Sequence, residues 1–284
     1  MPRGKSERSL ALIDAAYTIL AEIQSATVRA VCYRLFVAGL LPSMEKRHTN
    51  RVSTQLVYAR EHDLIPWQWI VDETRRVERK PTWANPAHYV RTVAHSYRRD
   101  RWREQPDHVE VWSEKGTVRG TLQPVLDEYG VPSRVLHGYG SATTLHDVAE
   151  DSVGQHFVAL YCGDWDPSGL HMSEADLPNR LAEYDGVVEV VRIALTAVDA
   201  VDTRLPGFHV ETKRLDSRYA WFRSRYGARC VELDALNPVE LRQRTADTIR
   251  SYIDWAAWER CERTEAAERE SMRHVLDNWQ AAAG

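Results

Sequence analysis

The sequence predicts a parallel α/β domain that is preceded by a small basic domain of helices and strands and followed by a helical extension. Between residues 107 and 237, runs of β-branched and apolar residues alternate with stretches of helical periodicity. This is the pattern of βαβ units around a parallel sheet. Amphipathic helices are predicted before this region and helix alone after it. We therefore expect three segments, at 1–106, 107–237 and 238–284.

The charges of the chain divide at nearly the same boundary. The formal net charge of the 284 residues is −4. Residues 1–105 hold 18 Lys and Arg against 11 Asp and Glu, whereas residues 106–284 hold 19 against 30. The first part is thus basic and suits a phosphate-rich partner, while the second is acidic and suits solvation or a divalent cation.

The N-terminal segment has the outline of a winged-helix DNA-binding module. Apolar residues at helical spacing predict helices over 6–24, 27–38 and 47–62, and residues 64–72 alternate like a strand or short hairpin. A helix–turn–helix followed by a β wing is typical of this class of module. The third helix would then be the recognition helix. Its outward basic residues are predicted to contact DNA: Arg47, Arg51 and Arg60.

Residues 75–103 form the most basic stretch of the chain, with aromatic residues interleaved. A helix is expected over 86–104. Arginines in such a segment can lie along DNA phosphates, although a basic helix face is often only solvated surface. The arginines predicted to contact DNA here are Arg98, Arg99 and Arg101.

The middle segment alternates strands and helices along the chain. Strands are expected at 109–113, 133–136, 157–162 and 187–195. Helices are expected between them at 117–129, 142–154 and 173–184. The apolar third strand is bounded by turn residues, so we expect it to be buried on both faces. Residues 238–280 follow as helix, with many Glu/Arg pairs at helical spacing.

Acidic residues follow two of these strands. Asp164 and Asp166 come directly after the third strand, and Glu114 follows the first. The carboxyl ends of parallel strands meet at one edge of a sheet, where ligands bind. Three carboxylates gathered there would repel one another unless a cation lies among them, and hard oxygen ligands select Mg²⁺ or Mn²⁺. We therefore predict that these three residues are metal ligands; the alternative is that an aspartate here only caps a helix.

A second acidic pair, Glu232 and Asp234, follows a short strand expected at 229–233. The pair could extend the metal site, or Asp234 could cap a helix. The chain has no Gly-x-x-x-x-Gly-Lys-[Ser/Thr] run and no Gly-x-Gly-x-x-Gly fingerprint. Neither a P-loop nucleotide site nor a Rossmann dinucleotide site is therefore expected.

Three motifs together resemble the Toprim domain of topoisomerases, primases and several nucleases. They are the strand that ends in Glu114, the Gly-Tyr turn at 138–139, and the run Gly-Asp-Trp-Asp-Pro-Ser-Gly at 163–169. The last is most similar to the topoisomerase VI A subunit and the related meiotic double-strand-break transesterase. The resemblance covers about residues 25–250, and it looks closest to short bacterial and phage proteins of this type. It implies a Toprim domain at 107–237 behind a winged helix.

The same resemblance implies a catalytic tyrosine. The family's nucleophile lies in an Arg-x-Ile-Phe-Tyr type segment, and Arg-Ala-Val-Cys-Tyr at 29–33 occupies the matching place. Tyr33 would attack a DNA phosphate, with Arg29 and Glu114 as further catalytic residues beside the metal. The alternative is that Tyr33 packs in the core beside Phe36, since a free tyrosine with a pKa of about 10 is a poor nucleophile.

The resemblance also implies partners. Double-stranded DNA would be the substrate. In this family the tyrosine of one subunit meets the Toprim site of the other, so a homodimer is expected. Strand passage by topoisomerase VI needs an ATPase subunit, which this chain does not contain. Topoisomerase activity by the chain alone is therefore not expected, and a separate ATPase subunit is a further candidate partner.

The remaining composition indicates a cytoplasmic, nucleoid-associated protein. No window approaches 18 consecutive apolar residues, so no membrane span is expected. The first residues are polar and lack the apolar core of a signal peptide. The four cysteines lie far apart without a Cys-x-x-Cys pair, which favours reduced thiols over disulfides or zinc.

Together these observations favour Mg²⁺- or Mn²⁺-dependent DNA cleavage by tyrosyl transesterification. Two alternatives stay open. One is a Toprim-type nuclease that hydrolyses DNA without a covalent intermediate. The other is a non-catalytic DNA-binding subunit of a larger genome-maintenance or phage-defence complex, although such a subunit has no need of three mutually repelling carboxylates.

Overall fold

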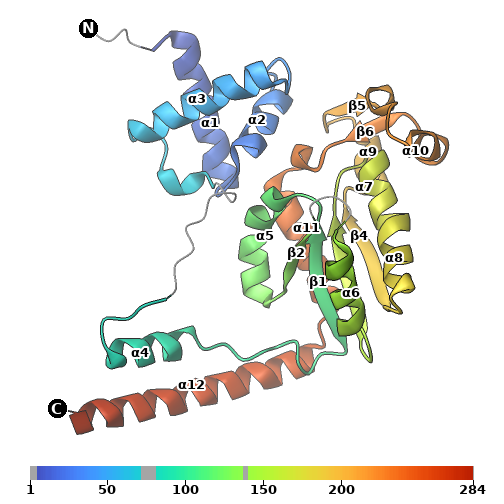
Figure 1. Cartoon of the computed structure of the whole chain (residues 1–284). Coiled ribbons are helices and arrows are strands. Elements are labelled where there is room, and N and C mark those ends of the chain that lie inside the picture. Colours follow the sequence, from blue (N-terminus) through green and yellow to red (C-terminus); the bar gives the residue numbers. More distant parts are fainter. Residues whose placement is uncertain (1–4, 72–80, 137–139, 284) are drawn as a thin grey trace.

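The computed structural model describes residues 5–71, 81–136 and 140–283, the last eight of these by backbone alone (Figure 1). Three helices form an N-terminal module: α1 (Glu7–Ile23), α2 (Val28–Val37) and α3 (Lys46–Glu61). Their apolar faces meet in one core that includes Leu20, Val31 and Leu56. The predicted helices over 6–24, 27–38 and 47–62 are confirmed to within two residues.

The strand or hairpin predicted over 64–72 is wrong for the part that the structure describes, which ends at Val71. The segment Trp67–Trp69 forms a 3-10 helix that begins after Pro66. In the described part of this segment, strand pairing is limited to an isolated parallel bridge between Ala26 and Ile70. The proline ring fixes its own backbone angle and removes a donor, which favours a turn here over a strand.

The predicted parallel sheet is confirmed. It consists of β1 (Asp107–Ser113), β2 (Ser133–Val135), β3 (His156–Cys162) and β4 (Val188–Ala194), all parallel and in the order β2-β1-β3-β4. A smaller antiparallel sheet joins β5 (Gly207–His209) to β6 (Arg229–Val231). An isolated bridge links Trp165 to Val231, so the small sheet lies against the loop that follows β3.

Side chains of β3 enter two different cores in alternation, as a strand buried on both faces requires. Val158 and Leu160 belong to one core, whereas Phe157 and Tyr161 belong to the other. The first core lies against α5 (Gly116–Tyr129) and α11 (Pro238–Ser251), and the second against α6 (Ala142–Asp151) and α8 (Leu177–Glu183). Helices thus flank the sheet on both faces (Figure 1).

Several predicted helix boundaries need correction. The helix expected at 173–184 begins earlier, as α7 (Pro167–His171), and continues through a π-helical turn at Met172–Asp176 into α8. Two short helices, α9 (Ala197–Val201) and α10 (Tyr219–Tyr226), follow β4 and β5. Two 3-10 helices lie beside β5 and β6, at Val210–Lys213 and Leu233–Ala235.

The C-terminal extension consists of two helices rather than one. The chain breaks between α11 and α12 (Trp255–Ala283), where Asp254 accepts hydrogen bonds from the N–H groups of Ala256 and Ala257. Such a cap satisfies donors at the start of the second helix. The helix α4 (Pro86–Ser96) lies along α12 (Figure 1).

The helix α4 is also shorter than the expected range of 86–104. Past Ser96 the backbone bonds to α12 instead: the N–H of Arg99 donates to Glu265, and Arg269 donates to the carbonyl of Tyr97. These bonds satisfy backbone groups that would otherwise continue α4. Within the described residues, no helix is both long and apolar enough to span a membrane.

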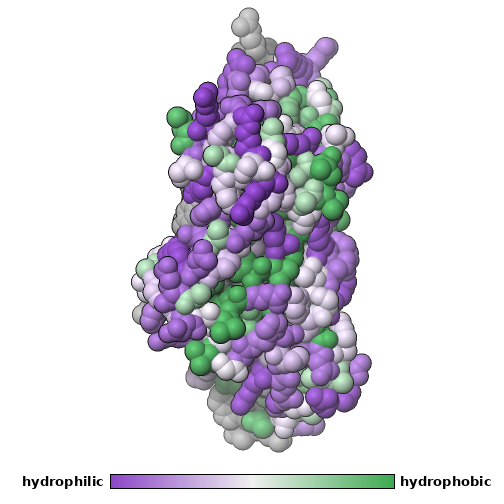
Figure 2. Space-filling view, turned by 90° about the vertical axis from the view of Figure 1, so that its right-hand side faces the viewer, coloured by the Kyte–Doolittle hydropathy of each residue, from purple (hydrophilic) through white to green (hydrophobic). Residues whose placement is uncertain are grey.

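The right-hand side of Figure 1 is the face that Figure 2 presents, and a hydrophobic patch occupies its middle between hydrophilic regions. The edge strand β4 lies on this side. Val187 before β4, and Val198 and Val201 after it, are about seven-tenths exposed or more. The β4 edge of the sheet therefore borders apolar surface.

One buried ion pair joins β1 to β2. Glu110 accepts two hydrogen bonds from Arg134, at 2.9 and 3.0 Å, and one from the indole of Trp112 at 2.6 Å. Burial alone would raise the pKa of Glu110, but hydrogen bonds from His108 and Arg134 outweigh burial and lower that pKa to about 2.

We expect this carboxylate to contribute stability that is complete above its ordinary pKa of 4.5 and is lost as the pH falls toward 2. Glu110→Gln should flatten that acid limb and should lower the free energy of unfolding near neutral pH by about 2 kcal/mol. Urea unfolding at several pH values checks this. The exposed Glu183→Gln is the matched control, and parallel acid limbs for wild type and Glu110→Gln would contradict the assignment.

Candidate active site

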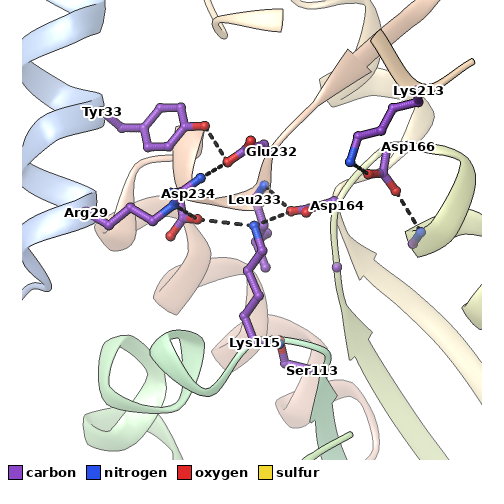
Figure 3. Close-up of polar contacts among 12 residues, drawn as sticks. Arg29, Tyr33, Ser113, Lys115, Asp164, Asp166, Lys213, Glu232, Leu233 and Asp234 are labelled. Atoms are coloured by element: carbon purple, nitrogen blue, oxygen red, sulfur yellow. Dashed lines mark hydrogen bonds and ion pairs between the residues drawn. The ribbon is translucent and has the colours of Figure 1, made fainter. Parts of the chain in front are cut away.

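The three predicted metal ligands lie at the carboxyl edge of the sheet. Ser113 at the end of β1 pairs in register with Cys162 at the end of β3. Glu114 and Asp164 therefore leave neighbouring strands close to the same level, and Asp166 follows two residues later. Figure 3 shows this edge with the side chains around it.

Asp164 is buried and held on one side only. Its Oδ1 accepts hydrogen bonds from Lys115 Nζ and from the N–H of Leu233, both at 2.8 Å. No partner to its other oxygen is found among the described residues. Burial raises the pKa of Asp164, although Lys115 and the Leu233 N–H act in the opposite direction.

Asp166 has a structural role as well as its place at this edge. Its Oδ1 accepts a hydrogen bond from the N–H of Gly169 at 2.8 Å, so it caps α7. Its Oδ2 forms an ion pair with Lys213 at 3.2 Å. Asp166 thus caps a helix while its carboxylate lies at the same sheet edge, so the cap does not decide between the two interpretations.

Glu114 lies in an environment with excess negative charge. Burial raises its pKa, and the charges of Asp164 and Asp166 raise it further. No hydrogen bond or ion pair to its carboxylate is found in the described part of the chain. The three acidic side chains thus act on one another electrostatically.

A half-buried arginine on β4 holds the loop that carries the two aspartates. Arg192 on β4 donates to the carbonyl oxygens of Gly163 at 3.0 Å, Asp164 at 3.3 Å and Leu195 at 3.1 Å, and also to that of Gly169. Burial lowers the pKa of this guanidinium. Arg192 therefore joins β4 to the loop and to α7, adding hydrogen bonds to carbonyls, of which those of Gly163 and Gly169 also accept from the backbone N–H groups of Leu195 and Met172.

Gly169 is needed for the close approach of α7 to this loop. A Cβ at this position would overlap the carbonyl oxygen of Asp164 and lie 3.2 Å from the carbonyl carbon. We expect Gly169→Ala to displace the loop and to lower the free energy of unfolding by about 1–3 kcal/mol, as overpacking does. Urea unfolding measures the change. Gly116→Ala, whose Cβ would meet nothing nearer than 4.0 Å, is the control, and equal stabilities of the two variants would contradict this expectation.

The predicted catalytic residues of α2 lie beside the second acidic pair. The hydroxyl of Tyr33 donates to Glu232 Oε2 at 2.5 Å. Arg29 forms ion pairs with the same Glu232 oxygen and, at 2.9 Å, with Asp234 Oδ2. The structure thus brings α2 to the sheet edge, and Figure 3 shows both side chains reaching across from the N-terminal module.

Tyr33 is only 5% exposed and its ring packs in the core of the sheet domain. Burial raises the pKa of Tyr33 well above its ordinary value, and the hydrogen bond to Glu232 raises it further. The phenol is therefore neutral near pH 7, and a base must take its proton before the oxygen can attack. Glu232 is the nearest acceptor, and its own pKa is lowered by Tyr33, Lys115 and Arg29 despite burial.

Lys115 connects the two groups of residues, and no role was predicted for it from the sequence. Its Nζ lies 2.8 Å from Asp164 Oδ1 and 3.2 Å from Asp234 Oδ2. Although burial acts in the opposite direction, Asp164 and Asp234 raise the pKa of Lys115, so it remains charged. Its position next to Glu114 was the one signal in the sequence, because a residue that follows a strand end lies at the same edge.

The carboxylates at this edge are of the ligand type that a divalent cation prefers, but in this structure they do not gather around one position. Glu114 and Oδ2 of Asp164 have no other described partners, whereas Asp164 Oδ1 and Asp166 Oδ2 are already paired with Lys115 and Lys213. The three carboxylates are not packed as tightly as ligands around one ion. In the described residues, the group of three whose ligand atoms lie within 4.8 Å of one another is His146, Asp147 and Glu150, all exposed on α6.

The predicted DNA-contacting arginines of α3 stay on the surface of the module. Arg47 forms an exposed ion pair with Glu45 at 2.8 Å, and Arg60 lies over the ring of Trp67 at 4.9 Å. Arg51 lines a surface pocket with Arg8. Nothing in these contacts prevents the arginines from reaching phosphates.

The arginines after α4 behave differently. Arg99 pairs with Glu268 at 2.6 Å, and Arg101 pairs with Glu262 at 3.0 Å. Arg98 is exposed and donates only to backbone carbonyls in the described structure. Arg99 and Arg101 thus hold the chain against α12, whereas Arg98 keeps its charge available.

The four cysteines are free thiols, all buried: Cys32, Cys162, Cys230 and Cys261. The Gly-Tyr turn at 138–139 lies outside the described residues. Comparison with known protein families, with curated proteins and with solved structures finds no match to this chain.

Proposed function

We propose that this protein is a divalent-metal-dependent enzyme that cleaves DNA through a Toprim-type site, with Tyr33 as the nucleophile. The observation that supports this most is the convergence of two sets of groups at one sheet edge. Glu114, Asp164 and Asp166 come from the ends of β1 and β3, and Tyr33 reaches the same edge from α2. A phenol hydrogen-bonded to a carboxylate beside an acidic metal-type site is suited to transesterification on a phosphate.

The proposed step conserves atoms and protons. The Tyr33 oxygen attacks the phosphorus of a DNA phosphodiester and gives its proton to Glu232. One P–O bond forms to the tyrosine and one P–O bond to deoxyribose breaks. The released sugar oxygen takes up a proton from water, and Glu232 returns the proton of the tyrosine to solvent. Arg29, which already binds Glu232, would keep that carboxylate in place. A bound Mg²⁺ would supply positive charge that stabilises the negative charge on the phosphate during transfer.

The α1–α3 module would bind the duplex in this account, as a winged-helix-like domain without a described wing. The Toprim assignment is supported by the four parallel strands and by the position of the acidic residues after β1 and β3. A homodimer and an ATPase subunit remain predictions of the family resemblance. In this chain, Tyr33 lies against Glu232 of its own subunit.

Metal-dependent hydrolysis without a covalent intermediate is the second candidate. The burial of Tyr33 and its raised pKa favour it, because both make the phenol a poorer nucleophile. Incubation with supercoiled plasmid and Mg²⁺ or Mn²⁺, followed by denaturation, separates the candidates. Transesterification leaves protein on the cleaved DNA, hydrolysis leaves the DNA free, and a non-catalytic subunit leaves the plasmid intact.

A further inference from the structure

A second basic surface lies away from the carboxylate edge, in the groove between α4 and α12. A pocket of about 370 Å³ opens there. Five of its six lining residues are basic, and none is acidic. The lining residues are Arg91, Ala94, His95 and Arg98 of α4 and its C-terminal end, and Arg269 and Arg273 of α12.

The positive charge of this pocket is only partly balanced. Arg269 forms an ion pair with Glu265 at 2.5 Å, and Arg273 forms one with Glu270. Neither Arg91 nor Arg98 has a carboxylate partner within the described residues. The sequence of α4 contains no acidic residue at all. The guanidinium groups of Arg91 and Arg98 thus have no described carboxylate partner, whereas those of Arg269 and Arg273 are paired with glutamates of α12.

Side-chain contacts hold the end of α4 and α12 together across the groove. Arg269 donates to the carbonyl of Tyr97 from Nε at 3.3 Å and Nη2 at 2.9 Å. The Tyr97 hydroxyl donates to Glu268 at 2.6 Å, and Arg99 pairs with the same carboxylate. These contacts join the end of α4 to α12 and fix the spacing of the arginines on the two sides.

We propose that the α4–α12 groove binds the phosphate backbone of double-stranded DNA and anchors the duplex outside the cleavage site. The groove holds four arginines and no lysine. The planar guanidinium group of arginine can donate two hydrogen bonds to one phosphate, which the ammonium group of lysine does less well. The helices α4 and α12 extend from the sheet toward the same side as the α1–α3 module (Figure 1). The choice of DNA over another polyanion rests on the proposed function.

The test uses the full chain, a labelled duplex and buffer without divalent metal, so that binding is measured without cleavage. Arg91→Ala/Arg98→Ala removes the two unbalanced charges and leaves the bonds between α4 and α12 in place. We expect duplex affinity to fall by about tenfold or more. The slope of log affinity against log salt should fall by about 0.9 for each phosphate that is no longer neutralised, which is about 2 for this variant.

Arg260→Ala/Arg263→Ala is the matched control, because both residues are exposed on α12 and neither lines the pocket. It should retain wild-type affinity and slope. Wild-type duplex binding by Arg91→Ala/Arg98→Ala would overturn the proposal. Binding of wild type and variant to anionic lipid vesicles is measured in parallel. If the variant loses vesicle binding but keeps duplex binding, the groove binds a membrane surface and the proposal is wrong. Duplex binding is measured without divalent metal and therefore without cleavage. The affinities can thus support or overturn the groove even if the proposed cleavage chemistry is wrong.

Discussion

Replacing Asp164 with asparagine is expected to reduce metal-dependent DNA cleavage by about 10³-fold or more, which corresponds to a loss of about 4 kcal/mol of transition-state stabilisation. Asparagine keeps an oxygen that can accept the hydrogen bond from the Leu233 N–H, so the loop has a partner in its present place. It removes the negative charge that a divalent cation needs. Plasmid cleavage with Mg²⁺ and metal binding by calorimetry measure the two effects.

Asp199→Asn is the control for this prediction. Asp199 is also buried, with 5% of its surface exposed, and it also accepts backbone and side-chain hydrogen bonds, but it follows β4 and pairs with Arg244 rather than with Lys115. Its replacement should lower stability without removing cleavage. If Asp164→Asn cleaves DNA and binds Mg²⁺ as wild type does, then the carboxylate edge is not the metal site.

Replacing Tyr33 with phenylalanine is expected to remove both the covalent protein–DNA adduct and the cleaved product. The ring would still pack in the core and under Arg29, whose guanidinium lies 5.5 Å from the ring centroid. Only the hydroxyl that donates to Glu232 is removed. The measurement is the yield of DNA that carries protein after denaturation, compared between variant and wild type.

Tyr129→Phe is the matched control, since Tyr129 is equally buried and its hydroxyl accepts a hydrogen bond from Arg250 at 2.7 Å. It should cleave DNA as wild type does. Full cleavage by Tyr33→Phe with no adduct would show that the chemistry is hydrolytic. The carboxylate edge would then act without the tyrosine.

The sheet could be predicted from the sequence because strand and helix periods differ. The run at 157–162 is apolar at every position except its tyrosine, and its short length between turn residues favours a strand with both faces buried. The strand predicted over 64–72 is wrong in its described part because a short run of apolar residues does not by itself distinguish a strand from a 3-10 turn. Pro66 was the signal against a strand, since it both fixes the backbone and removes a donor.

The site could be predicted in part. That Glu114 and Asp164 share an edge follows from the parallel order of β1 and β3, which the βαβ pattern indicates. The contact between Tyr33 and Glu232 joins residues 199 positions apart and depends on how the module packs on the sheet. No local pattern specifies such packing. The same holds for Arg99 and Arg101. A count of basic residues cannot show that glutamates of α12 pair with them.

The supporting residues were missed for a different reason. Lys115 and Arg192 have ordinary positions in the sequence, one at a helix start and one within a β-branched strand. Their roles come from the charges and carbonyls that the folded chain places around them, which are Asp164 and Asp234 for the lysine and the loop after β3 for the arginine. Only the assembled edge brings these groups together.

The most direct measurement is to incubate the purified full chain with supercoiled plasmid and Mg²⁺, denature the mixture, and identify any peptide left on the DNA by mass spectrometry. We expect a metal-dependent adduct through Tyr33 that is absent from Asp164→Asn and from Tyr33→Phe. Intact plasmid with both Mg²⁺ and Mn²⁺, or cleaved DNA that carries no protein, would contradict it.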